Sequence, residues 1–181
     1  MKKLVIFIQG GGEDGYEADA KLVASLRTAL GKKYNVEYPQ MPSVESLPDF
    51  GWLERIGEEI SLTNDKIILV GHSLGASMLL KYLSESQVQK IITGIFLIAT
   101  PFWSGDENWK QGLKLHKDFA VKIPKSTPIF LYQCKDDKVV PFDHLEFYKK
   151  NLPQAIFRII KSGGHQLNND LSLIAKDIKS L

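Results

Sequence analysis

Ile67-Ile68-Leu69-Val70-Gly71-His72-Ser73-Leu74-Gly75 is the stretch of sequence that decides the fold of this chain. Its first half is a continuous apolar run typical of a buried strand, and its second half has the pattern G-x-S-x-G. An apolar segment with helical spacing begins at once with Ala76. A sharp strand-to-helix turn of this kind lifts a serine hydroxyl clear of the sheet, whereas the alternative is a tight turn whose serine only caps the helix. The strand and helix on either side favour Ser73 as a nucleophile.

Further apolar runs predict strands at residues 4–8, 35–38, 66–70, 91–99, 128–133 and 155–160. Most of these runs are continuous, as expected when both faces of a sheet are covered. Helical periods lie between them, and the clearest predicts a final helix over residues 167–181. Alternating strands and helices indicate an α/β fold with a mostly parallel sheet and helices on both sides. Residues 100–127 are too long for a simple turn and predict a short helix or a mobile cover.

Length and charge narrow the class of protein. A chain of 181 residues predicts a single domain, 1–181, with a small cover segment at about 100–127. The net charge of +2, from 23 basic and 21 acidic residues, argues against a nucleic-acid binder. One cysteine, Cys134, allows no internal disulfide and favours a reducing, cytoplasmic setting. The apolar run at 4–8 is too short for a signal peptide or a membrane span, so we expect no membrane partner.

A serine nucleophile needs a base, and the base needs a carboxylate to orient it. In folds with this elbow the order along the chain is serine, acid, histidine. His165 follows the last predicted strand after two glycines, in a loop able to reach over the sheet edge, and is the predicted base. His116 lies in the cover segment, and His144 is predicted at the surface. Asp136 and Asp137 both follow the strand at 128–133, and the residues alone do not choose between them.

These ordered motifs resemble the α/β-hydrolase superfamily over nearly the whole chain. The short length is similar to its compact serine hydrolases related to retinoblastoma-binding protein nine and the bacterial YdeN proteins. The resemblance implies a three-layer fold with about six parallel strands in the order 2-1-3-4-5-6, lacking the first two strands of larger hydrolases. It also implies that Asp137 is the acid, because Asp137 stands three residues before Val140 in a D-x-x-V-P turn.

The glycine loop after the first strand has a competing interpretation. Gly10, Gly12 and Gly15 fit G-x-G-x-x-G, and Glu37 follows at about the 20-residue spacing of a ribose-binding acid in a dinucleotide fold. Two acidic residues inside the loop, Glu13 and Asp14, would however place negative charge where a pyrophosphate binds. The dinucleotide alternative also leaves the serine, aspartate and histidine motifs unexplained.

In the hydrolase interpretation this loop supplies one backbone N–H group of an oxyanion hole, and Leu74 N–H supplies the other. Gly10, Gly11 and Gly12 are all possible donors. Similarity to the His-Gly-x loops of esterases favours Gly11, although Gln9 stands where many of those loops carry histidine.

Phe102, Trp103 and Trp109 in the cover segment are predicted to line an apolar acyl pocket, and the alternative is that they pack the cover onto the body. The predicted function is a serine hydrolase, most specifically a carboxylesterase acting on small or medium esters. No histidine–carboxylate spacing indicates a metal site, and this chemistry needs neither metal nor cofactor. A non-catalytic interaction protein on a hydrolase scaffold is the alternative, because fold does not fix function.

Overall fold

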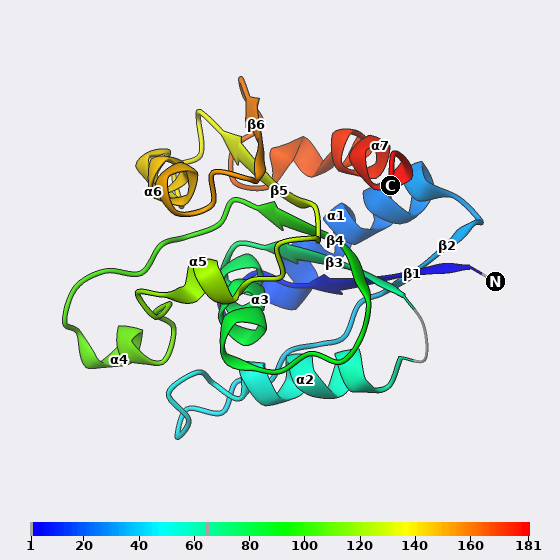
Figure 1. Cartoon of the computed structure of the whole chain (residues 1–181). Coiled ribbons are helices and arrows are strands. Elements are labelled where there is room, and N and C mark those ends of the chain that lie inside the picture. The colour runs from blue at the N-terminus through cyan, green and yellow to red at the C-terminus, as the bar shows by residue number, and fades with distance from the viewer. Residues whose placement is uncertain (1, 64–65) are drawn as a thin grey trace.

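A parallel β-sheet forms the middle layer of the computed structural model, which describes residues 2–63 and 66–181 (Figure 1). Within these residues the sheet has six strands in the order β2-β1-β3-β4-β5-β6, all paired in parallel. The strands are β1 Lys3–Ile8, β2 Tyr34–Glu37, β3 Ile67–His72, β4 Ile92–Ile98, β5 Ile129–Cys134 and β6 Ile156–Ile160. Both the parallel sheet and its predicted strand order are confirmed.

Two hydrophobic cores, one on each face, explain the continuous apolar runs. Side chains alternate along a strand, so Ile6 of β1 faces one core while Val5 and Phe7 face the other. In β3, Leu69 and Val70 divide between the cores in the same way. A strand that contributes to both cores has no solvent face and therefore needs no polar positions.

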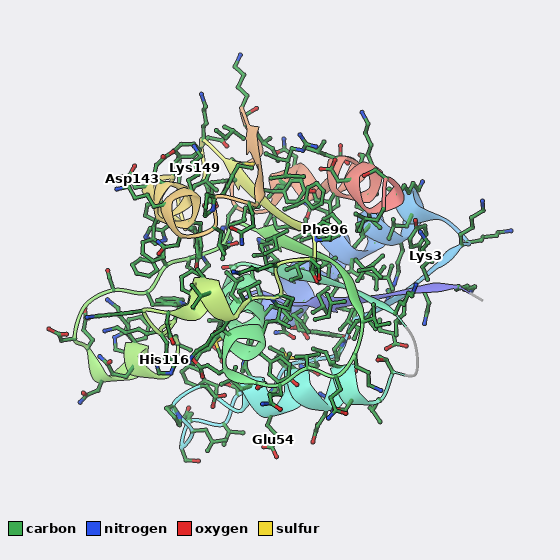
Figure 2. The ribbon with its side chains drawn as sticks, viewed as in Figure 1. Lys3, Glu54, Phe96, His116, Asp143 and Lys149 are labelled. Atoms are coloured by element: carbon green, nitrogen blue, oxygen red, sulfur yellow. The ribbon has the colours of Figure 1, made fainter. Side chains whose placement is uncertain are left out.

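Helices cover both faces of the sheet (Figure 1). α1 Gly15–Leu30 and α7 Ser172–Lys179 pack on one face, and α2 Trp52–Ser61, α3 Leu74–Glu85 and α6 Asp143–Asn151 contribute to the core on the other. Phe96 lies among the side chains at the centre of the molecule (Figure 2) and stacks on Phe130, with ring centroids 4.9 Å apart. The layers are those of a three-layer α/β fold.

The predicted final helix over residues 167–181 is wrong at its beginning. α7 begins only at Ser172, and Leu167–Asn169 form a separate 3₁₀ turn in which all three residues have positive φ. Leu167 and Leu171 are nevertheless buried in the same core as α7. The spacing of apolar residues therefore reported which side chains are buried, while the chain turns sharply after the His165 loop before the helix starts.

The cover segment between β4 and β5 contains two short helices, α4 Asn108–Gln111 and α5 Phe119–Lys122, as expected. Buried Leu113, Phe119 and Ile123 attach it to the core beside α3. His116 lies on this segment with its side chain exposed (Figure 2). None of the helices in the described part of the chain is long and apolar enough to cross a membrane.

Candidate active site

Ser73 sits on a strained turn between β3 and α3. Its φ of 51° and ψ of −123° lie in a region that residues other than glycine rarely adopt. The flanking glycines are required by close contacts: a Cβ on Gly71 would lie 2.7 Å from Ala76 Cα, and one on Gly75 would collide with the Gln9 carbonyl oxygen. The turn has the strand, elbow and helix that G-x-S-x-G predicts.

Asp137 and His165 are joined at the carboxyl ends of β5 and β6. Asp137 Oδ2 lies 3.0 Å from His165 Nδ1, and the Asp137 side chain is 1% exposed. Its Oδ1 accepts hydrogen bonds from the N–H groups of Val139, at 2.8 Å, and Val140, at 3.0 Å. Burial raises the pKa of Asp137, but the hydrogen bonds from His165, Val140 and Val139 outweigh it and hold the pKa below its usual value. An ionised Asp137 favours a proton on His165 Nδ1 and leaves Nε2 free to act as a base.

The neighbouring Asp136 has a different task. Its carboxylate accepts hydrogen bonds from the N–H groups of Gly163, at 3.0 Å, and Gly164, at 2.9 Å. The Gly164 and Gly163 donors lower the pKa of this carboxyl. Asp136 therefore holds the loop that carries His165, while Asp137 contacts the ring of His165.

The other histidines do not contact Asp137. His144 lies in the first turn of α6 and is half-buried, whereas a surface position was predicted; its Nδ1 accepts a hydrogen bond from Phe102 N–H at 2.9 Å. Burial lowers the pKa of His144. Cys134 is fully buried, and burial together with the charges of Asp136 and Asp137 raises its pKa to about 11. A neutral thiol is a poor nucleophile, so Cys134 does not compete with Ser73.

The elbow and the His165 loop lie against each other. The rings of His72 and His165 have centroids 4.7 Å apart, and His72 Nε2 lies 3.0 Å from the His165 carbonyl oxygen. In the described residues no hydrogen bond joins Ser73 Oγ to the His165 ring; in resting hydrolases such contacts are often long and tighten with substrate. The fold thus brings Ser73, Asp137 and His165 to one edge of the sheet from the ends of three strands.

The glycine loop after β1 meets the elbow at Leu74. A Cβ on Gly11 would lie 2.7 Å from Leu74 Cδ2, so the Gly11 backbone packs directly against the residue after Ser73. Gly10 N–H already donates to Asp19 Oδ2 at 2.7 Å. Of the three candidate backbone N–H donors, that of Gly10 is therefore already used in a hydrogen bond, and Gly11 is the residue in contact with Leu74. The assignment of Gly11 and Leu74 to an oxyanion hole stays a prediction that this packing supports.

Comparisons with known proteins identify the family of this chain. The sequence profile of the family described as Serine hydrolase matches residues 23–172. The chain belongs to the serine hydrolase family. It is similar to YdeN of Bacillus subtilis (strain 168), whose name describes it as a hydrolase, with 25% identity over 141 residues, 75% of this chain and 70% of YdeN.

Solved structures share the fold of this serine hydrolase. The CarC serine hydrolase involved in carbazole degradation has a TM-score of 0.76 at 18% identity, covering 98% of this chain and 90% of that chain. The ydeN gene product of B. subtilis has a TM-score of 0.70 at 20% identity, covering 99% and 98%. Est1E from Butyrivibrio proteoclasticus has a TM-score of 0.72 at 16% identity, covering 99% and 86%. At these identities the likeness shows a shared α/β-hydrolase fold.

The cover aromatics of this serine hydrolase make packing contacts. Trp103 Nε1 donates to Ser77 Oγ at 3.2 Å, and its ring meets Trp109 edge to face at 5.8 Å between centroids. Phe102 stacks on Phe147 with centroids 3.5 Å apart, whereas Trp109 is 56% exposed. These contacts fix the cover to α3 and α6. The prediction that the three aromatics line an acyl pocket stays a prediction.

A cleft of about 600 Å³ lies beside the glycine loop, against the segment at residues 40–52. Apolar side chains from Met41, Phe50, Trp52 and Leu74 contribute to it. Gln9, which is 5% exposed, connects the two sides because its Oε1 accepts the Met41 N–H at 3.0 Å. The sequence did not point to this cleft, because the segment has neither a periodic pattern nor a motif.

Two buried groups next to the site were also missed. Asp19 and His72 are each 1% exposed and lie 2.8 Å apart. A signal for Asp19 was present, since it stands on the buried face of α1 between Gly15 and Leu22, where an apolar residue is expected. His72 sits within the elbow motif, at a position where G-x-S-x-G allows any residue.

Proposed function

We propose that this serine hydrolase cleaves small or medium carboxylic esters through an acyl-enzyme. The observation that supports this most directly is the buried Asp137 carboxylate bonded to His165 Nδ1 at 3.0 Å, beside the strained elbow of Ser73. A serine on such a turn and a histidine oriented by a carboxylate are the groups that nucleophilic acyl transfer requires.

In the acylation step, Ser73 Oγ attacks the ester carbonyl carbon while His165 Nε2 takes the hydroxyl proton. The carbonyl oxygen becomes an anion and accepts hydrogen bonds from the N–H groups of Leu74 and Gly11. Asp137 stabilises the imidazolium that forms on His165. Collapse of the intermediate breaks the bond to the alkoxy group, which takes the proton from His165 and leaves as the alcohol.

In the deacylation step, a water molecule attacks the acyl-enzyme carbonyl and gives a proton to His165. The second intermediate collapses, the bond to Ser73 Oγ breaks, and Ser73 recovers its proton from His165. The products are a carboxylic acid and the starting enzyme. His165 carries every proton, and Ser73 and water are the two nucleophiles, so the reaction as proposed requires no cofactor.

One part of the ester would bind in the cleft beside the glycine loop. The cleft lining combines the apolar Met41, Phe50, Trp52 and Leu74 with polar side chains that include Gln40, Ser43 and Glu45. This cleft adjoins Gly12 and Leu74, and so the predicted oxyanion hole, and about 600 Å³ suits a small or medium ligand. The other part would extend toward the cover aromatics, on the side where Trp103 packs against α3. With one part of the ester in the cleft and the other part against the cover aromatics, the site would suit an ester of small or medium size.

Labelling with a fluorophosphonate tests the proposal, because an activated serine displaces fluoride and keeps the phosphonate. We expect one adduct by intact mass, mapped to Ser73 by peptide sequencing, and no adduct on Ser73→Ala. A panel of esters, thioesters, amides and lactones then identifies the leaving group, with turnover lowered roughly 10⁴–10⁶-fold in Ser73→Ala. A well-folded protein that takes no label and cleaves no member of the panel would instead be an interaction protein on a hydrolase scaffold.

A further inference from the structure

A buried charged cluster lies under the active site, centred on Asp19 of α1. Three nitrogens converge on its carboxylate. Gly10 N–H donates to Oδ2 at 2.7 Å and Gln166 Nε2 donates to Oδ1 at 3.1 Å, while His72 Nδ1 lies 2.8 Å from Oδ2. Burial raises the pKa of Asp19, but the hydrogen bond and charge of His72, with the N–H groups of Gly10 and Gln166, outweigh it and lower the pKa. Because Gly10 and Gln166 each donate to one carboxylate oxygen, and the pKa is lowered, Asp19 is an ionised acceptor and a proton belongs on the His72 Nδ1 that faces it.

The second nitrogen of His72 faces another acceptor. His72 Nε2 lies 3.0 Å from the carbonyl oxygen of His165, while Nδ1 faces Asp19. A neutral imidazole has one N–H donor and one lone pair, so it would turn that lone pair toward an oxygen inside the protein. Donation from both nitrogens requires the imidazolium, which the adjacent Asp19 carboxylate balances in charge.

Each partner in this cluster adjoins a residue of the proposed machinery. Gly10 precedes the predicted oxyanion donor Gly11, His72 precedes the nucleophile Ser73, and the third contact is the backbone of the base His165 itself. One buried pair therefore connects the loops that follow β1, β3 and β6. These loops are far apart in sequence, since Asp19 and His72 are separated by 53 positions and His72 and His165 by 93.

We propose that Asp19 and His72 form a buried ion pair, with hydrogen on both His72 nitrogens, that positions the oxyanion loop, the elbow and the His165 loop relative to one another. The inference rests on the proposed function. Both are positioning residues, because Asp19 and His72 are argued to act through Gly10, Ser73 and His165. Misplacement of catalytic groups by about 1 Å lowers rates roughly 100-fold. Asp19→Asn should therefore lower kcat by about 10- to 100-fold and leave KM nearly unchanged, because Asp19 does not line the substrate cleft.

Asp177→Asn is the matched control. Asp177 is also a buried carboxylate, 6% exposed, and is bonded to Arg158 Nη2 at 3.0 Å and to the Tyr132 hydroxyl at 2.7 Å. It lies on α7, and neither of these partners adjoins Ser73 or His165 in the sequence. Both variants should lose stability, but only Asp19→Asn should lose kcat. Equal losses of kcat in the two variants, or a folded Asp19→Asn with the kcat of the wild type, would overturn the inference.

Nuclear magnetic resonance of ¹⁵N-histidine-labelled wild type tests the protonation state without a variant that must remain active. We expect His72, identified by the signals lost in His72→Gln, to show two protonated ring nitrogens at neutral pH. A single protonated nitrogen would overturn the ion pair even if Asp19→Asn fails to fold. A wild-type protein that takes no fluorophosphonate label and hydrolyses no ester would instead overturn the proposed function. The ¹⁵N signals would still show whether one or both ring nitrogens of His72 are protonated.

Discussion

Asp137→Asn tests the acid of the proposed triad, and the structure indicates how the new amide would orient. Oδ1 of Asp137 accepts hydrogen bonds from two backbone N–H groups, those of Val139 and Val140, while Oδ2 faces His165 and accepts a hydrogen bond from Gln133 Nε2 at 3.1 Å. In asparagine the single oxygen should stay with the two backbone donors, which leaves the NH₂ group facing His165. His165 Nδ1 must then accept, so the proton moves to Nε2 and the ring no longer serves as a base for Ser73.

The magnitude follows from the hydrogen bonds. Turning the oxygen toward His165 would give up two backbone hydrogen bonds, each contributing about 1–1.5 kcal/mol, but would keep the hydrogen bond that Gln133 Nε2 donates to Oδ2 at 3.1 Å. The wrong tautomer is therefore favoured by the equivalent of one hydrogen bond, about 1–1.5 kcal/mol. Loss of the negative charge beside the imidazolium removes further stabilisation. At about 1.4 kcal/mol per factor of ten, we expect kcat to fall by roughly 10²–10⁴.

The assay is kcat on a chromogenic ester for wild type, Asp137→Asn and the neighbouring Asp136→Asn, with melting temperatures as a check on folding. Asp136 bonds Gly163 and Gly164 rather than the His165 ring, so Asp136→Asn should lower kcat far less and act through the loop. A folded Asp137→Asn with more than a tenth of wild-type kcat would refute the tautomer argument. A reversed order of damage would make Asp136 the acid.

Three further predictions follow from the geometry. Gly11→Ala should lower kcat, because its Cβ would lie 2.7 Å from Leu74 Cδ2 and would displace the loop from the residue after Ser73. The melting temperature should change little, because the contact is with the end of a side chain. Unchanged kcat would remove Gly11 as an oxyanion donor. Phe50→Ala should change relative kcat/KM across a series of ester sizes, and Trp103→Ala should do so by about 10-fold if it contacts substrate. A flat series with a large drop in melting temperature makes Trp103 structural. The folded-state pKa of Asp137 is lowered below its unfolded-state value, which is near 4. The contribution of Asp137 to stability is therefore present above the unfolded-state pKa and is lost as the pH falls through the folded-state pKa. Urea unfolding midpoints should decline from about pH 6 to pH 3, and a rise would contradict the cause given for the shift.

Local patterns were enough for the sheet and for the positions of two residues of the candidate site. The four inner strands are largely buried on both faces and are therefore mostly apolar, so their runs were readable without any knowledge of their neighbours. The edge strands β2 and β6 are partly exposed and carry Glu37 and Arg158, yet their apolar residues were enough to place them. Ser73 and His165 were predictable because an elbow and a glycine loop are short, and their residue types follow from backbone geometry within a few positions. The final helix was predicted too long because apolar spacing reports burial, and Leu167 is buried in a 3₁₀ turn outside the helix.

Only the tertiary structure decided the contacts between segments distant in the chain. Which aspartate reaches His165 depends on the direction of the turn after β5 relative to Gly163 and Gly164, and both carboxylates find partners there. The Asp19–His72 pair joins α1 to β3, so no window of sequence contains both residues. The sequence by itself determined the strands, the elbow and the chemistry of single residues, because these depend on neighbours along the chain. The acid's orientation, the occupied Gly10 donor and the cleft depend on packing between loops, which propensity and spacing do not encode.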